Sequence, residues 1–255
     1  MINFEGKVVL VTGGSRGIGS AAVTAIADAG GSVIIHYGGN AAAAAKTAAT
    51  VGAGRSHIVQ GDLSEPGAAK AVWEKSLAWK GHIDVLVNNA GIFQSAPVDG
   101  NDDTWAEAWQ RTLQVNLASC GELCRHAVNT WREAESGGII VNVSSRAAWR
   151  GDAPDQWAYA ASKGGMVSLT KTIARGFAAD GIYAYCVAPG FTETDMALDA
   201  FEKDPAFKEV VIRDIPMGEI APASDIANTI CFLASGLVPH ATGSTIDVNG
   251  ASYVR

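Results

Sequence analysis

The sequence lacks the features that define several classes of protein. Its longest apolar runs, such as Val8 to Val11 and Ala41 to Ala45, are far shorter than the roughly 20 residues that cross a bilayer, and Glu5 and Lys7 interrupt the N-terminus before a signal-like core forms. It has 19 Lys and Arg against 26 Asp and Glu, a formal charge of −7, and so no basic surplus for binding the phosphates of a nucleic acid. We therefore expect a cytoplasmic protein with neither a membrane nor a nucleic acid as partner.

Cysteine is scarce, and its spacing excludes two further classes. The four cysteines, Cys120, Cys124, Cys186 and Cys231, contain no Cys-x-x-Cys pair and have no paired histidine nearby. Neither a disulfide framework nor a zinc site is predicted, and no metal is expected in the functional site. The cysteines are expected to be small buried hydrophobes.

The chain is rich in apolar residues and glycine, with 48% hydrophobic residues and 29 glycines in 255 positions. Short apolar runs, many of them β-branched, alternate with segments long enough for helices, which is typical of a βαβ succession. The runs are apolar throughout, as in a parallel sheet covered by helices on both faces. We predict seven strands, at Lys7 to Val11, Ser32 to His36, His57 to Val59, Ile83 to Val87, Gly138 to Val143, Ile182 to Val187 and Gly243 to Val248.

No linker or internal repeat divides the chain, so we predict one α/β domain over residues 1–255, a doubly wound Rossmann fold. The segment from Phe191 to Ile215 breaks the alternation of strands and helices with charges, Pro205 and two phenylalanines. We expect this segment to be irregular and to form a substrate lid.

A glycine-rich turn joins the first strand to a helix predicted over Ile18 to Ala29. It reads Thr12-Gly13-Gly14-Ser15-Arg16-Gly17-Ile18-Gly19. Backbone N–H groups at the start of such a helix bind anions, so a pyrophosphate fits there, although an ordinary glycine-rich turn has the same composition.

Several motifs, in order along the chain, resemble the short-chain dehydrogenase/reductase family. They are the glycine turn, Asn88-Asn89-Ala90-Gly91 after the fourth strand, Asn116 in a helical stretch, Tyr159-x-x-x-Lys163, and Pro189-Gly190 after the sixth strand. The resemblance runs from Lys7 to the C-terminus. It implies an oxidoreductase that transfers hydride between NAD(P)(H) and a carbonyl or secondary alcohol, and a homotetramer with the Tyr159 helix at an interface.

The resemblance assigns catalytic roles to Asn116, Ser145, Tyr159 and Lys163. Tyr159 and Lys163 share a helix face. We expect the ammonium, together with the positive ring of an oxidised nicotinamide, to lower the pKa of the phenol toward working pH, where it is the acid in ketone reduction and the base in alcohol oxidation. Ser145 is expected to bond the substrate carbonyl. Ser144 remains the less favoured choice, because Ser145 is one residue further from Tyr159 than is common in the family. Asn116 is expected to hold a water beside the lysine.

The other site residues concern the dinucleotide. No carboxylate follows the second strand, and Arg16 is placed to meet a 2′-phosphate, so NADP(H) is favoured over NAD(H). The alternative is a solvated Arg16 and a His36 that touches no ligand. Asp62-Leu63 resembles the adenine-contacting pair of the family, and Pro189 to Thr194 the segment beside the nicotinamide. The predicted cofactor-binding set is Gly13, Ser15, Arg16, Gly17, Ile18, Gly19, His36, Tyr37, Asp62, Leu63, Asn89, Ala90, Gly91, Tyr159, Lys163, Pro189, Gly190, Thr192 and Thr194.

The substrate class stays open between two alternatives. The glycine turn and the C-terminal stretch resemble reductases of 3-oxoacyl chains on an acyl carrier protein. An acidic carrier needs basic groups at its docking surface, and here Glu133, Glu135 and Asp180 stand where those reductases tend to have them. We therefore predict NADPH-dependent reduction of a small free ketone, sugar or polyol-derived carbonyl, with the carrier-bound substrate as the alternative.

Aromatic residues flank the predicted site. Trp149 and Trp157 lie between Ser145 and Tyr159, and Phe191 follows Pro189-Gly190. We expect them either to wall the pocket mouth or to pack against a lid or another subunit. A nucleotide-binding regulator without turnover is the alternative of another class, but such a protein would be expected to lack Tyr159 or Lys163.

Overall fold

The computed structural model describes residues 1–52 and 54–255, which contain a seven-stranded parallel sheet in the order β3-β2-β1-β4-β5-β6-β9. The strands are β1 Val8–Val11, β2 Ser32–Tyr37, β3 Ser56–Gln60, β4 Val85–Asn88, β5 Gly138–Val143, β6 Ile182–Pro189 and β9 Thr245–Val248. Each predicted run coincides with or overlaps one strand. The strand order reverses direction between β1 and β4, so the predicted doubly wound Rossmann fold is confirmed.

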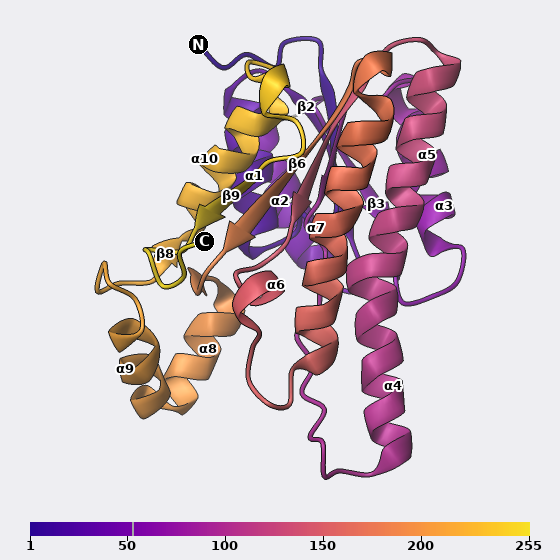
Figure 1. Cartoon of the computed structure of the whole chain (residues 1–255). Coiled ribbons are helices and arrows are strands. Elements are labelled where there is room, and N and C mark those ends of the chain that lie inside the picture. The colour runs from indigo at the N-terminus through magenta and orange to yellow at the C-terminus, as the bar shows by residue number, and fades with distance from the viewer. Residues whose placement is uncertain (53) are drawn as a thin grey trace.

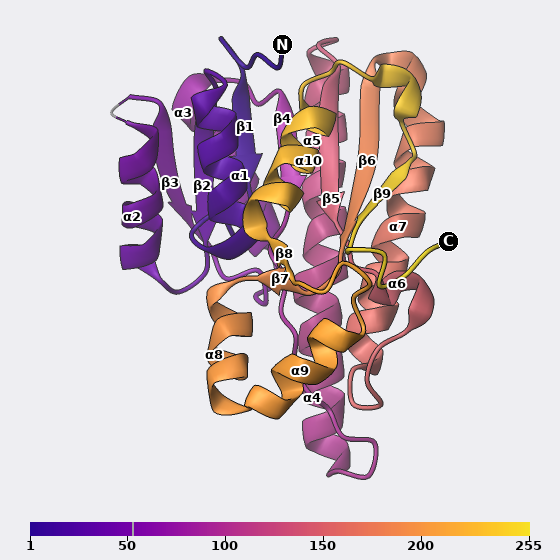
Figure 2. The ribbon, with the colours of Figure 1, turned by 90° about the vertical axis from the view of Figure 1, so that its left-hand side faces the viewer.

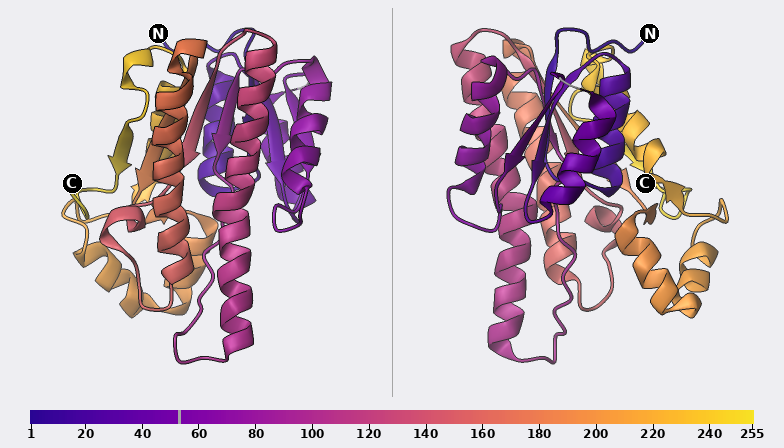
Figure 3. Two further views of the ribbon diagram at one scale, coloured as in Figure 1. Left: turned by 45° about the vertical axis from the view of Figure 1, so that its right-hand side comes forward. Right: turned by 180° about the vertical axis from the view of Figure 1, so that it is seen from behind.

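Helices cover both faces of the sheet (Figures 2 and 3). One face packs against α1 Gly17–Asp28, α2 Ala41–Val51 and α10 Ala223–Ala234, and the other against α3 Ala68–Lys80, α5 Ser119–Glu133 and α7 Trp157–Phe177. The remaining helices are α4 Asp102–Leu113, α6 Ala147–Arg150, α8 Asp195–Lys203 and α9 Pro205–Arg213, with short helical turns at Gln114–Ala118, Ala178–Asp180 and Pro239–Ala241.

The two apolar layers explain why the strands are hydrophobic throughout. In β1, Val9 and Val11 belong to the core cluster beneath α1 and α10, whereas Val8 and Leu10 belong to the cluster beneath α3 and α5. Successive side chains of a strand point to opposite faces, so a strand buried on both faces has no polar alternation.

The carboxyl ends of the strands meet at one end of the molecule. Figure 1 shows α6, α8 and α9 at that end, together with the first turns of α7. Helix α4 continues through the turn at Gln114–Ala118, which is π-helical, into α5, and it extends beyond the sheet on the same side. Ligands of open α/β sheets bind at this edge.

The expectation of an irregular segment from Phe191 to Ile215 is wrong, because the segment folds into α8 and α9. Helix α9 begins with Asp204, whose side chain accepts a hydrogen bond from the N–H of Phe207 (3.0 Å), followed by Pro205 at the first helical position. Phe201, Val211 and Ile215 form a small core of their own between the two helices. Two short strands that the pattern did not predict, β7 Thr192–Glu193 and β8 Ala221–Pro222, pair at the base of the segment.

Among the described residues, no helix is both long and apolar enough to cross a membrane.

Candidate active site

The glycine turn presents its backbone at the start of α1. No side chain caps this helix at its N-cap residue, Arg16, and the first turn contains no acidic residue. The Cβ of any other residue at Gly19 would lie 2.1 Å from the carbonyl oxygen of Gly13, so only glycine allows this close packing. Asn89 reaches across from the end of β4 and donates from Nδ2 to the carbonyl oxygens of Thr12 (2.9 Å) and Gly13 (3.2 Å).

Thr12, which the sequence analysis did not select, joins the two strand ends. Its hydroxyl accepts hydrogen bonds from the N–H groups of Asn89 and Ala90, both at 3.0 Å, and its side chain is buried. A hydroxyl directly between a buried strand and the glycine turn was the available signal. Thr12 and Asn89 together hold the β1 and β4 loops in fixed register.

His36 does not face a ligand as the predicted cofactor set requires. It is 2% exposed, its Nδ1 accepts from the N–H of Gly13 (3.2 Å), and its Nε2 lies 2.9 Å from the carbonyl oxygen of Gly61. These partners require the neutral tautomer with the proton on Nε2, and burial lowers the pKa of His36. Both nitrogens are engaged inside the protein, so His36 braces the glycine turn against the end of β3.

The adenine end of the predicted site is only partly assembled by side chains. Asp62 Oδ1 accepts from the N–H (2.9 Å) and hydroxyl (2.7 Å) of Ser64, and these bonds lower its pKa. Leu63 is buried in the core cluster beneath α3, so its side chain does not face a nucleotide. Arg16 is exposed, Tyr37 is half-buried at the end of β2, and Gly38 and Gly39 border open space.

Ser15 and Ile18 lie on the protein side of the glycine turn. The carbonyl oxygen of Ser15 accepts from the Thr47 hydroxyl on α2 (3.0 Å), and Ile18 packs on the core beneath α1. The backbone carbonyl of Ser15 and the side chain of Ile18 therefore face the protein.

The segment after β6 returns to the glycine turn. Pro189 accepts from the N–H of Arg146 (3.0 Å), and the Thr192 hydroxyl donates to the carbonyl oxygen of Gly190 (3.2 Å). A Cβ at Gly17 would lie 3.1 Å from Thr194 Cγ2, and a hollow of about 310 Å³ opens between these two residues and α8. The start of α8 therefore covers the start of α1.

The predicted catalytic side chains converge at the carboxyl edge. Ser145 forms a side-chain hydrogen bond with Tyr159, and its Oγ also accepts from the N–H of Ala147 (3.1 Å). Ser144 instead donates to the carbonyl oxygen of Lys163 (2.9 Å) and ties β5 to α7. The geometry therefore brings Ser145, and not Ser144, to Tyr159. The short helix α6 lies between Ser145 and Tyr159.

Lys163 and Asn116 meet at Gly91. Lys163 is 4% exposed, donates from Nζ to the carbonyl oxygen of Val143 (2.8 Å) and lies 5.6 Å from the centroid of the Tyr159 ring. Asn116 lies in the π-helical turn, accepts from the N–H of Ile92 (2.8 Å) and donates to its carbonyl oxygen (3.0 Å). A Cβ at Gly91 would sit 3.3 Å from Asn116 Oδ1 and 3.5 Å from Lys163 Nζ, so glycine keeps this space open.

The predicted lowering of the Tyr159 pKa also depends on the ring of an oxidised nicotinamide and stays a prediction, whereas the protein's own groups shift this pKa upward. Burial raises the pKa of Tyr159 to about 12 and the negative charge of Asp152 adds to the rise, while the hydrogen bond from Ser145 opposes it. Burial also lowers the pKa of Lys163 to about 8. Desolvation disfavours the charged form of each group.

Known proteins match nearly the whole chain. A family model described as enoyl-(acyl carrier protein) reductase matches residues 13–251. The chain is 34% identical over 99% of its length to all of the 3-oxoacyl-[acyl-carrier-protein] reductase of Escherichia coli (strain K12), and 33% identical over 97% of its length to 94% of the 3beta-hydroxysteroid dehydrogenase 1 of Eggerthella lenta. A solved structure of the angucycline C-6 ketoreductase LanV with bound NADP superposes with a TM-score of 0.87 at 32% identity, covering 98% of this chain and 96% of that one.

The chain belongs to the short-chain dehydrogenase/reductase family. It is an NAD(P)-dependent oxidoreductase that acts on a carbonyl or hydroxyl group.

In this short-chain dehydrogenase/reductase, the three aromatic residues expected either to wall the pocket mouth or to pack against a lid or another subunit each contact another side chain of the same chain. The ring of Trp157 meets Trp105 of α4 edge-on at 6.5 Å, and the guanidinium of Arg255 lies 4.1 Å from the ring centroid of Trp149. Phe191 packs on Phe207 of α9. The aromatic side chain that does contact Tyr159 is Phe93, on the loop after β4, which the sequence analysis missed.

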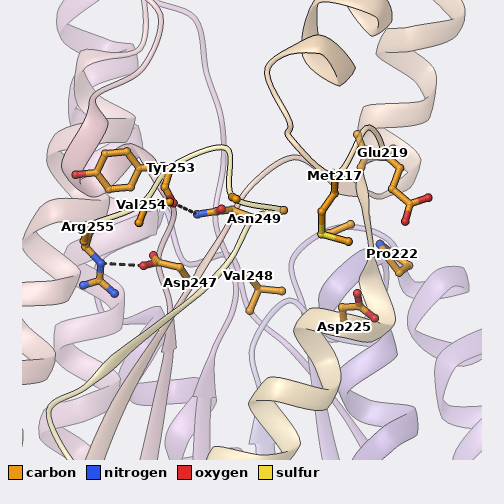
Figure 4. A pocket seen from close by; sticks show the side chains of 14 residues that line it. Met217, Glu219, Pro222, Asp225, Asp247, Val248, Asn249, Tyr253, Val254 and Arg255 are labelled. Carbon is orange, nitrogen blue, oxygen red and sulfur yellow. Dashed lines mark hydrogen bonds and ion pairs between the residues drawn. The ribbon is translucent and has the colours of Figure 1, made fainter.

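A cavity of about 610 Å³ in the reductase lies away from the catalytic side chains (Figure 4). It is bounded by the end of β9, the C-terminal tail and the loop before α10. Asn249 donates to the carbonyl oxygen of Tyr253 (3.0 Å) and Arg255 pairs with Asp247 (2.9 Å), so these contacts shape the cavity wall. The cavity is a feature of the C-terminal tail and not of the dinucleotide site.

The acidic residues that argued against a carrier protein lie at the far end of the reductase. Glu135 precedes β5 and Asp180 precedes β6, at the amino ends of strands whose carboxyl ends form the site. Asp180 also pairs with Arg132 (2.9 Å). Within one chain, these charges cannot meet a carrier docked at its own Tyr159.

Proposed function

We propose that the protein is an NADPH-dependent reductase of small free ketones, with Tyr159 as the proton donor. The observation that supports it most directly is that Tyr159 lies between Ser145 and Lys163, with the Lys163 amine at the space left by Gly91. The hydroxyl of Ser145, after β5, and the phenol and amine of α7 are thereby directed to one place at the ligand-binding edge of the sheet.

Each of these residues has a separate role in carbonyl reduction. NADPH, when bound, supplies the hydride. Ser145 holds the carbonyl oxygen by a hydrogen bond, and Tyr159 delivers a proton to that oxygen. A pKa of about 12 keeps the phenol protonated at neutral pH, which suits reduction better than alcohol oxidation. Lys163 sits beneath the phenol ring, and Asn116 fixes the backbone at Ile92 beside it.

The test is the substitution Tyr159→Phe, which removes the proton donor and keeps the ring. General acid catalysis contributes about two to four orders of magnitude in rate, so we expect kcat for ketone reduction to fall by that amount. NADPH should still bind, with a change in its dissociation constant much smaller than the fall in kcat. Tyr253→Phe, on the C-terminal tail, is the matched control. Unchanged turnover in Tyr159→Phe would refute the assignment.

The preference for NADP(H) over NAD(H) is a second part of the proposal. The uncapped start of α1 offers N–H groups to a pyrophosphate, the exposed Arg16 stands at that start, and no carboxylate follows β2. The NADP in the LanV structure is consistent with this preference. Arg16→Ala should weaken NADPH binding by about tenfold or more, the loss of one charged hydrogen bond, and leave NADH binding nearly unchanged. Equal weakening for both coenzymes would contradict it.

The free ketone is favoured over the carrier-bound chain by the charges at the site. Asp152 and Asp155 lie on the loop before α7, and they would repel an acidic carrier or a phosphate-bearing arm. The relatives include proteins named for a hydroxysteroid and for an angucycline ketone. The alternative, reduction of 3-oxoacyl chains on a carrier protein, is supported by the similarity to the Escherichia coli reductase. Comparing kcat/KM for free ketones with that for a 3-oxoacyl carrier thioester decides between them.

Two structural parts of the proposal concern the whole chain. Residues 1–255 act as one catalytic domain in which residues 191–215 close over the site, because Thr194 covers the glycine turn and α8 follows directly. Four copies assemble into a homotetramer with α7 at one of the interfaces, as the family resemblance implies.

A further inference from the structure

We propose that Phe93 forms one wall of the substrate site and makes the enzyme selective for uncharged ketones whose carbonyl belongs to a flat ring system. The proposal rests on the proposed ketone reduction by Tyr159. It concerns the loop from Asn89 to Asn101, between β4 and α4, which Figure 1 shows descending beside the first turn of α7.

Phe93 lies against the proton donor. Its ring meets the ring of Tyr159 edge-on, with centroids 4.8 Å apart and an interplanar angle of 79°. The Phe93 side chain is nevertheless 50% exposed. A large apolar ring that contacts Tyr159 with one edge and leaves half of its surface open offers that surface to whatever binds there.

The loop holds Phe93 from both sides. On one side, the side-chain amide of Asn116 bonds both the N–H and the carbonyl oxygen of Ile92. On the other side, the N–H of Ala96 donates to the carbonyl oxygen of Asp155 (2.9 Å), and the hydroxyl of Ser95 bonds the Asp155 carboxylate. The ring is therefore a fixed surface, and a rigid wall discriminates between substrate shapes better than a mobile one.

The other aromatic side chains near Tyr159 cannot replace it. Trp157 stands two residues from Tyr159, turns toward α4 and packs on Trp105. Phe191 packs between Phe207 and the guanidinium of Arg146, which lies 5.3 Å from its ring centroid. Phe93 is left as the ring that a substrate at Tyr159 would meet.

The charges around this wall favour an uncharged substrate. Asp152 acts on Tyr159 as a negative charge. The cations on the loop after β5, Arg146 and Arg150, both pair with Asp214 of the segment after α9, at 3.2 and 2.9 Å. An anionic group would meet carboxylates and already paired arginines, whereas a flat apolar ring would meet the open face of Phe93. Stacking and edge contacts between rings favour such a ligand over a flexible chain.

The experiment compares two ketones and four proteins. NADPH consumption is followed with 2-tetralone, a bicyclic ketone fused to a benzene ring, and with ethyl acetoacetate, a linear 3-oxo ester, for the unsubstituted enzyme, Phe93→Ala, Phe93→Leu and Val98→Ala. Val98 is the matched control, because it lies on the same loop and is 55% exposed. Phe93→Leu keeps an apolar side chain and removes the ring. Fluorescence titration gives the NADPH dissociation constant of each protein.

We expect Phe93→Ala and Phe93→Leu to lower kcat/KM for 2-tetralone by about tenfold, mainly through KM, and that for ethyl acetoacetate by less than about twofold. NADPH binding and Val98→Ala should be unchanged. An equal loss for both ketones would mean that Phe93 only supports Tyr159, and no loss, or full activity in Phe93→Leu, would mean that no ring contact exists; each overturns the proposal.

A binding measurement separates this proposal from the proposed function. Titration of 2-naphthol into the protein saturated with NADP⁺ reports ring binding without turnover, and Phe93→Ala should weaken it by about tenfold. If the unsubstituted enzyme reduces neither ketone but binds 2-naphthol in a Phe93-dependent way, the proposed reaction fails and the ring-binding wall stands. Binding that does not depend on Phe93 overturns the wall itself.

Discussion

Burial raises the pKa of Tyr159 and lowers that of Lys163, and these two shifts predict how ketone reduction depends on pH. The pKa of Tyr159 is about 12 and that of Lys163 about 8. As pH rises from neutral, Lys163 loses its positive charge well before Tyr159 loses its proton. With saturating NADPH, we expect kcat/KM for ketone reduction to be level near pH 7 and to fall with an apparent pKa near 8. Initial rates measured across this range provide the check.

A Lys163→Arg variant distinguishes the group responsible. Its guanidinium stays charged throughout the range, so the fall near pH 8 should disappear. If Lys163→Arg folds, as circular dichroism would verify, and the fall persists, another group controls the profile.

His36 predicts a second pH dependence, in stability. Its pKa is lowered from an ordinary value of 6.5 by burial, with the facing carboxylate of Asp62 acting in the opposite direction. At pH above 6.5 both folded and unfolded chains carry a neutral His36. As pH falls below 6.5, the unfolded chain takes up a proton before the folded one, so the free energy of unfolding decreases. A protonated Nδ1 would also face the N–H of Gly13, so NADPH binding should weaken in the same range.

The variant His36→Asn tests this account, because its Oδ1 can accept from Gly13 but cannot take up a proton. Thermal unfolding and NADPH titration at several pH values should show a weaker acid dependence than in the unsubstituted protein. An acid dependence identical in both proteins would assign it elsewhere. His36→Phe, which removes both bonds, should weaken NADPH binding at every pH.

These residues also mark the limit of prediction from sequence. Tyr159 and Lys163 could be placed together because helical spacing is geometric, and Ser145 because strand ends share an edge. The role of His36 depends on the register of β2 against its neighbours β1 and β3. That register decides which backbone groups the ring nitrogens of His36 reach, and the sequence does not give it. Phe93 lies on an irregular loop with no periodicity, so nothing in the sequence indicated that Asn116 and Asp155 would hold it over Tyr159.

Among the elements of the fold, the segment that contains α8 and α9 is expected to open and close over the site, and KM should report this opening. Asp214, just after α9, pairs with Arg146 and Arg150 beside the catalytic loop, and its carboxylate is half exposed. Exposed pairs contribute about 0.2–1 kcal/mol, so Asp214→Asn should shift the segment toward an open state by up to about fivefold. We expect a rise in KM of that order, with kcat and thermal stability nearly unchanged.

A double variant of Asp214 with Arg150 controls for simple charge effects. Once Asp214→Asn is in place, Arg150→Gln should add little, because the pair is already broken. Additive effects on KM would mean that the two residues act independently and that the pair does not hold the segment.

This segment was also the element least well predicted. Asp204 followed by Pro205 is a regular helix-start signal, and it correctly marks α9 in the structure. The mixture of charges and phenylalanines in the segment hid this signal. Its apolar residues pack between two helices, so they do not form the regular apolar spacing of a single helix. The strands, by contrast, are continuous apolar runs, and burial on both faces leaves them no other placement. β4 and β9 begin a few residues later than predicted, because turns with aspartate and glycine precede them.

For the whole molecule, the outer face of α7 predicts how the chain assembles. Ala161 and Ser168 are exposed and Gly164 is half-buried, spaced three and four residues apart so that they share one face. Small residues on a shared face let a second helix approach closely, at the 8–10 Å or so between axes seen in packed helices. If α7 pairs with its copy as the proposed homotetramer requires, a bulky charge at Ser168 blocks the contact.

Light scattering after size-exclusion chromatography measures this. We expect the unsubstituted protein to elute as four copies of the 26.4-kDa chain, and Ser168→Arg to elute as a smaller species with lower thermal stability. The same change at an exposed alanine of α2, Ala45→Arg, leaves the α7 face intact and should leave the mass unchanged. A monomer in the unsubstituted protein, or an unchanged mass in Ser168→Arg, would show that α7 is not at the interface. Tyr159 and Lys163 lie on the opposite, inward side of this helix, so pairing through the outer face would hold the catalytic side chains rigid without touching them.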